Sequence, residues 1–174
     1  MRIIGFAGWS GAGKTTLRAR LSPALVADGC SVSTIKHAHH AFDIDQPGKD
    51  SHTHRQAGAS EVLISSARRW ALIHELRDAP EPSLHELIEH VTPVDLLLIE
   101  GFKRDRHPKI EVHRPSVGKP LLQPDDAHIV GVATDAALFL PVPVLQLDDI
   151  ASIVKFVREH AVHLHRVERQ ENAA

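Results

Sequence analysis

Residues 8–15 read GWSGAGKT and fit the phosphate-loop pattern G-x-x-x-x-G-K-[ST]. The apolar segment before them, Arg2 to Ala7, is typical of a buried strand that stops at Gly8. Leucines recur at helical spacing after Lys14, and this spacing predicts a helix that ends near Gly29. Because the pattern binds phosphate when it joins a strand to a helix, we predict a site for a nucleoside triphosphate in this loop.

The loop offers the groups that a triphosphate requires. Its glycines let backbone N–H groups turn toward a phosphate, and the helix N-terminus adds a positive dipole end. We expect Lys14 to reach the β- and γ-phosphates and the Thr15 hydroxyl to be one ligand of Mg²⁺. The nucleotide-binding residues predicted here are Gly8, Trp9, Ser10, Gly11, Ala12, Gly13, Lys14, Thr15 and Thr16.

Strand-like and helix-like segments alternate along the rest of the chain, which indicates βαβ units. The predicted fold is therefore an α/β fold of the P-loop NTPase type, with a mostly parallel sheet flanked by helices. We expect one nucleotide-binding domain over residues 1–162, an inserted β-hairpin, and a polar tail over residues 163–174. Pro23 is expected to kink the first helix. Further strands are predicted at 32–36, 94–99, 109–113 and 129–133, the hairpin at 61–65 and 69–76, and further helices from 83 to about 90 and after 148–149.

The amino-acid composition excludes several classes of protein for this chain. Of the 174 residues, 43% are hydrophobic and 24% charged, which is ordinary for a globular domain. The formal net charge of −2 argues against nucleic-acid binding, and no apolar run is long enough to span a membrane. Cys30 is the single cysteine, so an intramolecular disulfide is excluded. These features predict a soluble, cytoplasmic protein.

A magnesium site also needs a carboxylate, and Glu100 is the strongest candidate. It follows an apolar strand and so reaches the edge of the sheet at which ligands of open α/β folds bind. Lys14, Thr15 and Glu100 are thus the predicted catalytic residues. Asp50 is a second candidate for the metal, with an N-cap as its alternative role, and Asp45 is a weaker one. Thr15, Asp50 and Glu100 form the predicted metal set.

Histidines are abundant, with 14 in the chain, and five lie near the long polar segment 37–49. Imidazole suits Zn²⁺ and Ni²⁺, but the spacing does not match a closed four-ligand set. Contact with phosphate or with a partner is the alternative, to which Lys36, Lys49 and Arg55 would add positive charge. The five histidines are His37, His39, His40, His52 and His54.

Asp135 follows a predicted buried strand and is a candidate for reading guanine. Its carboxylate could accept two N–H bonds from the edge of that base, a pattern that adenine does not offer. A turn-forming role is the competing interpretation.

Four segments together resemble the MobB family, the molybdopterin-guanine dinucleotide biosynthesis proteins B. They are residues 8–15; KHAHH at 36–40 with Phe42 and Asp45; PGKDS at 47–51 leading to AGA at 57–59; and LIEGFK at 98–103. The resemblance extends to about Glu159. It implies a homodimeric GTP-binding protein with weak GTPase activity, which assists a MobA-like nucleotidyltransferase that joins GMP to molybdopterin. Molybdopterin itself is a further candidate ligand. The resemblance also places Lys14 and Thr15 at phosphate and Mg²⁺, with Glu100 and Asp50 as carboxylates.

Two other functions remain open from the residues. The first is a small-molecule kinase, in which segment 37–50 holds an acceptor hydroxyl and Asp43 or Asp45 is the base. The second is a nickel or zinc metallochaperone whose GTPase cycle controls metal release.

Overall fold

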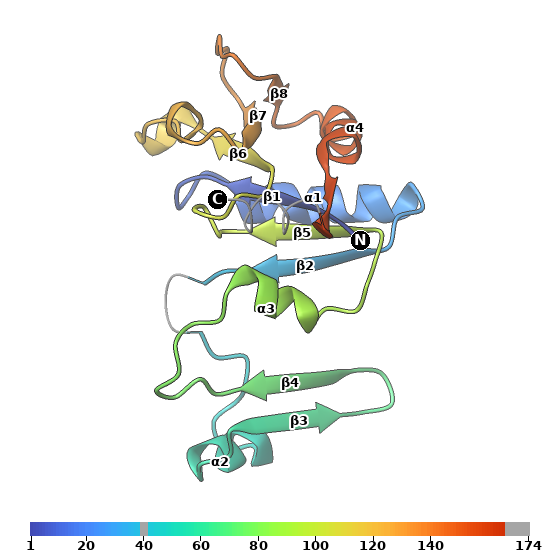
Figure 1. Ribbon diagram of the computed structural model, residues 1–174, viewed down its shortest axis with the longest axis vertical. Helices are drawn as coiled ribbons and strands as arrows, with labels where there is room; N and C mark the ends of the chain where they lie inside the picture. Colours follow the sequence, from blue (N-terminus) through green and yellow to red (C-terminus); the bar gives the residue numbers. More distant parts are fainter. Residues whose placement is uncertain (39–41, 166–174) are drawn as a thin grey trace. The chain divides into compact units, whose positions relative to one another are not determined.

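The computed structural model describes residues 1–38 and 42–165 of the chain (Figure 1). Its contacts divide the chain into two compact units. The larger unit comprises Met1–His37 and Glu86–Ala174, and the smaller one comprises Ala38–His85.

A parallel sheet forms the centre of the larger unit, in the strand order β2-β5-β1-β6-β7-β8. The mostly parallel sheet predicted from the sequence is therefore confirmed. A short ninth strand pairs antiparallel with the start of β1. The strands are β1 (Arg2–Ala7), β2 (Val32–Lys36), β5 (Leu96–Glu100), β6 (Lys109–His113), β7 (Ile129–Thr134), β8 (Val144–Gln146) and β9 (Val162–His163).

Helices α1 (Lys14–Ala27) and α4 (Ile150–His160) pack with the sheet in one hydrophobic core. Leu17, Leu21 and Leu25 are the buried residues of α1, as their helical spacing predicts. Pro23 lies within α1, which continues past it to Ala27. The Asp149 carboxylate accepts a hydrogen bond from the Ser152 N–H and so caps α4. Short 3-10 helices occur at Pro115–Val117 and Gln123–Asp125, and α3 (Leu84–Glu89) crosses the boundary between the units in the sequence.

The smaller unit contains a hairpin of β3 (Glu61–Ser65) and β4 (Trp70–His74), preceded by α2 (Asp50–Gln56). The predicted hairpin is confirmed, although its second strand is shorter than predicted. Arg55 organises this unit, because its guanidinium forms ion pairs with three carboxylates. These carboxylates belong to Asp43, Asp45 and Glu75.

The sequence did not predict two short strands of the larger unit, and it placed the start of one long strand two residues too early. β8 and β9 have only three and two residues, too few for a periodic pattern. The predicted strand 94–99 begins two residues later and extends to Glu100. Its entry is held by Asp95, whose carboxylate accepts hydrogen bonds from the N–H and the hydroxyl of Ser31 at 2.9 and 2.6 Å.

Candidate nucleotide-binding site

The phosphate loop follows β1 at the carboxyl edge of the sheet, where ligands of open α/β folds bind. Parallel pairing places Phe6 of β1 opposite Glu100 at the end of β5. On its other side, β1 pairs with β6, and Ala7 lies opposite Glu111. The sheet register therefore brings Glu100 beside the start of the loop, although 85 residues separate it from Thr15.

The loop depends on glycine at its entry and its exit. Gly8 has φ +140°, and a Cβ atom there would lie 2.4 Å from the carbonyl oxygen of Val112. Gly13 has φ +96° and is the residue immediately before α1. A residue with a side chain would be strained at both positions. The loop therefore needs glycine at positions 8 and 13 to adopt this backbone conformation.

Lys14, the first residue of α1, bends back over the loop. Its Nζ atom donates hydrogen bonds to the carbonyl oxygens of Gly8 and Trp9, both at 3.0 Å. Burial lowers the pKa of Lys14 below its ordinary value, and Lys103 and Lys36 lower it further, while Glu100 opposes the shift. The ammonium thus lies among other cations, a setting that suits an anionic ligand with several charges.

Thr15 and Glu100 provide two oxygen ligands of the kind that Mg²⁺ binds. The Thr15 hydroxyl lies 3.4 Å from Oε1 of Glu100, so the predicted pair is brought together. The other carboxylate oxygen, Oε2, contacts the guanidinium of Arg18. A hydroxyl and a carboxylate fit a hard cation that otherwise keeps water and phosphate oxygens as ligands.

Arg18 belongs to this site, although the sequence reasoning did not assign it. It follows Lys14 by four residues and Thr15 by three on the same helix. Residues at these spacings share a helix face, which is the signal that could have identified it.

A group of polar contacts surrounds Trp9 on one side of the loop. The indole Nε1 donates a hydrogen bond to the carbonyl oxygen of Pro120 at 2.8 Å. The Nζ atoms of Lys103 and Lys119 lie 4.8 and 5.7 Å from a Trp9 ring centroid. The segment 114–122 is anchored by Glu111, whose buried carboxylate accepts backbone N–H bonds from residues 122 and 123, both at 2.9 Å. The loop residue Trp9 is therefore held by contacts from later in the chain.

The turn after Glu100 has an unusual backbone. Gly101 has φ +91° and Phe102 has φ +47°, a left-handed conformation that is uncommon for a bulky residue. A Cβ atom on Gly101 would lie 2.7 Å from Cβ of His37, and the His37 and Phe102 rings are 5.0 Å apart. Close packing thus explains the glycine that follows Glu100.

The segment after this turn is fixed by Lys109 of β6. Its fully buried Nζ atom donates hydrogen bonds to the carbonyl oxygens of Lys103 and Asp105. The same atom lies 3.0 Å from a carboxylate oxygen of Asp126. The backbone of Lys103, whose side chain reaches Trp9, is therefore anchored in the protein interior.

Asp135 lies directly after β7, and its carboxylate forms an ion pair with Arg114. Arg114 in turn packs beside the phosphate loop, since a Cβ atom on Gly13 would lie 3.4 Å from its Nε atom. Arg114 therefore links Asp135 to the phosphate loop, because it contacts the Asp135 carboxylate and packs beside Gly13. Its role as a reader of guanine stays a prediction.

The remaining predicted residues belong to the smaller unit. Asp50 is the first residue of α2, whose N-cap is Lys49, so an N-cap role for Asp50 is not observed and its metal role stays a prediction. Asp45 accepts a hydrogen bond from the Ser51 hydroxyl at 2.7 Å. His39 and His40 lie outside the described residues. Within residues 1–38 and 42–165, no group of three or more His, Cys, Asp or Glu side chains is placed to hold a metal ion.

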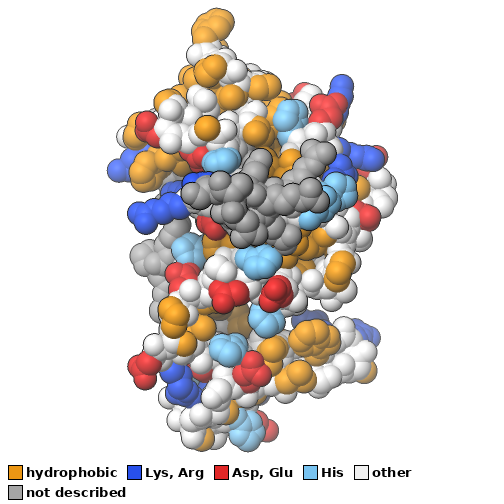
Figure 2. Space-filling model, viewed as in Figure 1, with side chains coloured by type: hydrophobic (Ala, Val, Ile, Leu, Met, Phe, Trp, Pro, Cys, Tyr) orange, Lys and Arg blue, Asp and Glu red, His pale blue; other side chains and the backbone are white. Residues whose placement is uncertain are grey.

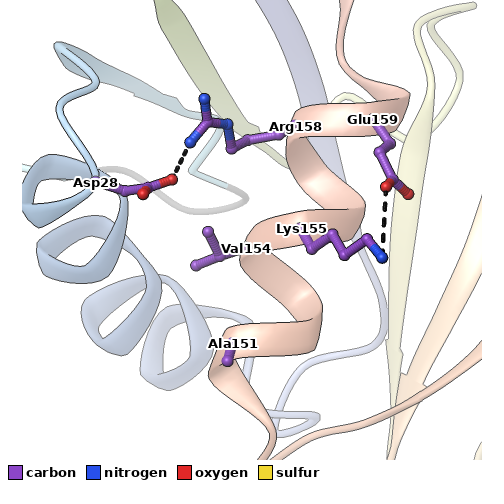
Figure 3. Close-up of a pocket in the computed structure, with 6 residues that line it drawn as sticks. All are labelled: Asp28, Ala151, Val154, Lys155, Arg158 and Glu159. Atoms are coloured by element: carbon purple, nitrogen blue, oxygen red, sulfur yellow. Dashed lines mark hydrogen bonds and ion pairs between the residues drawn. The ribbon is translucent and has the colours of Figure 1, made fainter.

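A pocket of about 370 Å³ lies elsewhere, between the end of α1 and the outer face of α4 (Figure 3). Its charged side chains pair with one another: Arg158 contacts Asp28, and the Lys155 and Glu159 charges are 3.9 Å apart. The phosphate loop does not line this pocket.

The glycine-rich loop between β1 and α1, with Lys14, Thr15 and Glu100 drawn together at the edge of a parallel sheet, defines a P-loop NTPase-type protein. The sequence matches the family described as "Molybdopterin guanine dinucleotide synthesis protein B" over residues 3–135. The chain therefore belongs to the MobB family.

Relatives and solved structures agree with this assignment. The chain is 42% identical over 160 residues to the "Molybdopterin-guanine dinucleotide biosynthesis adapter protein" of Escherichia coli (strain K12), covering 90% of this chain and 91% of that protein. It is 39% identical to the protein of the same name from Haemophilus influenzae, covering 94% and 91%. A crystal structure of "molybdopterin-guanine biosynthesis protein B (mobB)" superposes with a TM-score of 0.71 at 25% identity, covering 90% and 98%.

The structure adds one observation on membranes. Within the described ranges 1–38 and 42–165, no helix has both the length and the apolar character needed to cross a bilayer.

Proposed function

We propose that this chain is an adapter in molybdopterin-guanine dinucleotide biosynthesis and that it binds GTP with Mg²⁺ at residues 8–16. The observation that carries the proposal is the contact between Thr15 and Glu100 beside a phosphate loop, in a chain of the MobB family. Relatives that share about two fifths of its residues are named as adapter proteins of this biosynthesis.

The loop residues have distinct roles in this proposal. Backbone N–H groups of residues 8–13 and the Lys14 ammonium bind the phosphates, and the Thr15 hydroxyl with Glu100 holds the metal ion. Mg²⁺, when bound, neutralises charge on the β- and γ-phosphates. We expect slow hydrolysis, because Glu100 already accepts contacts from Thr15 and Arg18 and is not free to orient water.

Guanine preference is supported by the guanine dinucleotide in the names of the relatives and by the position of Asp135 after β7. Calorimetric titration with GTP and with ATP, both with Mg²⁺, tests it. Tighter binding of GTP supports the proposal, and equal affinity for the two nucleotides would contradict it. An Asp135→Asn variant that lowers GTP affinity without changing ATP affinity would assign the reading to this carboxylate.

The partner that we propose is a MobA-like nucleotidyltransferase, which joins GMP to molybdopterin and which the adapter assists in the cytoplasm. Deletion of the chain from its host should lower the activity of enzymes that carry this cofactor. Tagged wild-type protein should also retain the nucleotidyltransferase on an affinity column. Unchanged enzyme activity in the deletion strain would contradict an adapter role.

We further propose that the chain is a homodimer that pairs through its hairpin. Leu63, Leu72 and Trp70 are 62%, 41% and 65% exposed, and the register of β3 and β4 places them on one face. Hydrophobic side chains are visible at the surface of this hairpin in Figure 2. A two-stranded sheet is only marginally stable alone, and an exposed apolar face of this kind marks an interface.

Light scattering on Leu63→Glu and Leu72→Glu variants tests the dimer. We expect a charge on this face to convert the dimer to a monomer. Arg68→Glu in the hairpin turn is the matched control and should leave the dimer intact. A wild-type protein that is monomeric at micromolar concentration would contradict the proposal.

A further inference from the structure

The ion pair between Arg18 and Glu100 gives the first helix a role beyond holding phosphate. One oxygen of the Glu100 carboxylate contacts the Arg18 guanidinium, and the other lies 3.4 Å from the Thr15 hydroxyl. The arginine and glutamate side chains are 12% and 7% exposed. Glu100 is therefore shared between the proposed metal ligand Thr15 and a resident positive charge.

A positive charge at this position opposes the arrival of another cation. The repulsion between two positive charges is stronger where protein shields them from water than at an exposed site. Mg²⁺ is attracted to the same oxygens, so the same guanidinium weakens its binding. Salt screens the effect poorly because the pair is nearly buried.

We propose that Arg18 is the resident counter-ion of the metal site, which neutralises Glu100 in the absence of Mg²⁺ and lowers the affinity of the site for Mg²⁺ alone. This inference rests on the proposed function, since it takes Thr15 and Glu100 as the metal ligands. Arg18 does not touch the metal ion in this proposal and acts on it only through the Glu100 carboxylate. The phosphates of the nucleotide then supply the negative charge that the paired Glu100 no longer offers, so metal binding follows nucleotide binding.

Two measurements on Arg18→Met test the inference. The first is the Mg²⁺ concentration that gives half-maximal binding of a fluorescent GTP analogue. We expect this concentration to fall at least about tenfold, because the repulsion by Arg18 is removed. The second is the unfolding temperature with Mg²⁺ and no nucleotide. Mg²⁺ should raise this temperature for Arg18→Met and leave it unchanged for the wild type.

Control variants separate charge from general damage to the helix. Arg18→Lys keeps a positive charge near Glu100 and should stay close to the wild type in both measurements. Arg20→Met removes a charge from the same helix, where Arg20 pairs with the exposed Asp148, and should have no effect. Arg18→Met leaves a buried carboxylate unpaired and so lowers stability. Combining it with Glu100→Gln should restore stability and abolish the response to Mg²⁺.

The outcomes distinguish this inference from the proposed function. If the wild type binds nucleotide with Mg²⁺ but Arg18→Met requires the same or a higher Mg²⁺ concentration, Arg18 is only a structural ion pair and the inference is overturned. If the wild type binds no nucleotide, the proposed function fails. In that case the unfolding temperatures measured with Mg²⁺ alone still test the role of Arg18. Equal responses of Arg18→Met and wild type to Mg²⁺ would overturn the inference as well.

Discussion

The carbonyl oxygen of Val112 lies where a side chain on Gly8 would have to begin, 2.4 Å from the position of a Cβ atom. β6 therefore presses directly against the entry of the phosphate loop, and the backbone of Gly8 adopts φ +140°. The oxygen belongs to a strand and has little freedom to move, so the loop depends on glycine at this position.

Gly8→Ala should therefore damage both the fold and the site. We expect a loss of about 2–4 kcal/mol in the free energy of unfolding, from the strained backbone and the overlap with Val112. GTP affinity should fall as well. Gly29→Ala is the matched control, since Gly29 has φ +83° with open space around it. It should cost only about 1–2 kcal/mol, the usual penalty for a side chain in left-handed backbone, and leave nucleotide binding unchanged, as measured by urea unfolding and calorimetry. Equal losses in the two variants would contradict the role of Val112.

Lys109 should be among the most sensitive positions outside the loop. Its buried ammonium holds two backbone carbonyls and lies against Asp126. Lys109→Met leaves that carboxylate without its partner, and we expect a loss of about 3–5 kcal/mol in urea unfolding. Lys155→Met, which removes an exposed pair on α4, should cost less than about 0.5 kcal/mol. A small effect at Lys109 would show that the anchor is dispensable.

His107 should make the protein sensitive to mild acid. The side chain is fully buried, and burial lowers its pKa to about 3, with a further contribution from Lys109. Between pH 6.5 and 3 the unfolded chain binds a proton on this ring that the folded protein does not. Above pH 6.5 His107 therefore does not reduce the free energy of unfolding. Below pH 6.5 the free energy of unfolding falls by about 1.4 kcal/mol per pH unit because of this group.

Comparison of the wild type with His107→Leu isolates this effect. Below pH 6.5, unfolding free energies measured from pH 7 to pH 4 should fall more steeply for the wild type than for His107→Leu, by about 1.4 kcal/mol per pH unit. Parallel curves would show that His107 takes no part in the acid response.

The sequence predicted the local elements of the site well, because each has a strong local cause. The loop pattern, the strand before it and the leucines of α1 predicted the βα unit, and the apolar run before Glu100 predicted the strand that brings this carboxylate to the loop. β8 and β9 have too few residues for any pattern to show.

Other features depend on contacts between distant segments. The burial of Lys109 and Glu111 in β6 was not predicted, since charged residues in a strand are usually taken to face water. Each is stabilised by groups from later or earlier loops, which only the folded chain brings together. The pairing of Arg18 with Glu100 is of the same kind.

We expect Lys14 and the loop around it to bind a nucleotide together with Mg²⁺. Calorimetric titration of GTP and Mg²⁺ into wild type, Lys14→Ala and the exposed control Lys155→Ala tests it directly, with unfolding temperatures to show that each variant is folded. We predict that wild type and Lys155→Ala bind with equal affinity, and that folded Lys14→Ala loses at least about tenfold because a charge-assisted contact to phosphate is removed. Equal affinity in Lys14→Ala and wild type would show that the nucleotide does not bind at this loop.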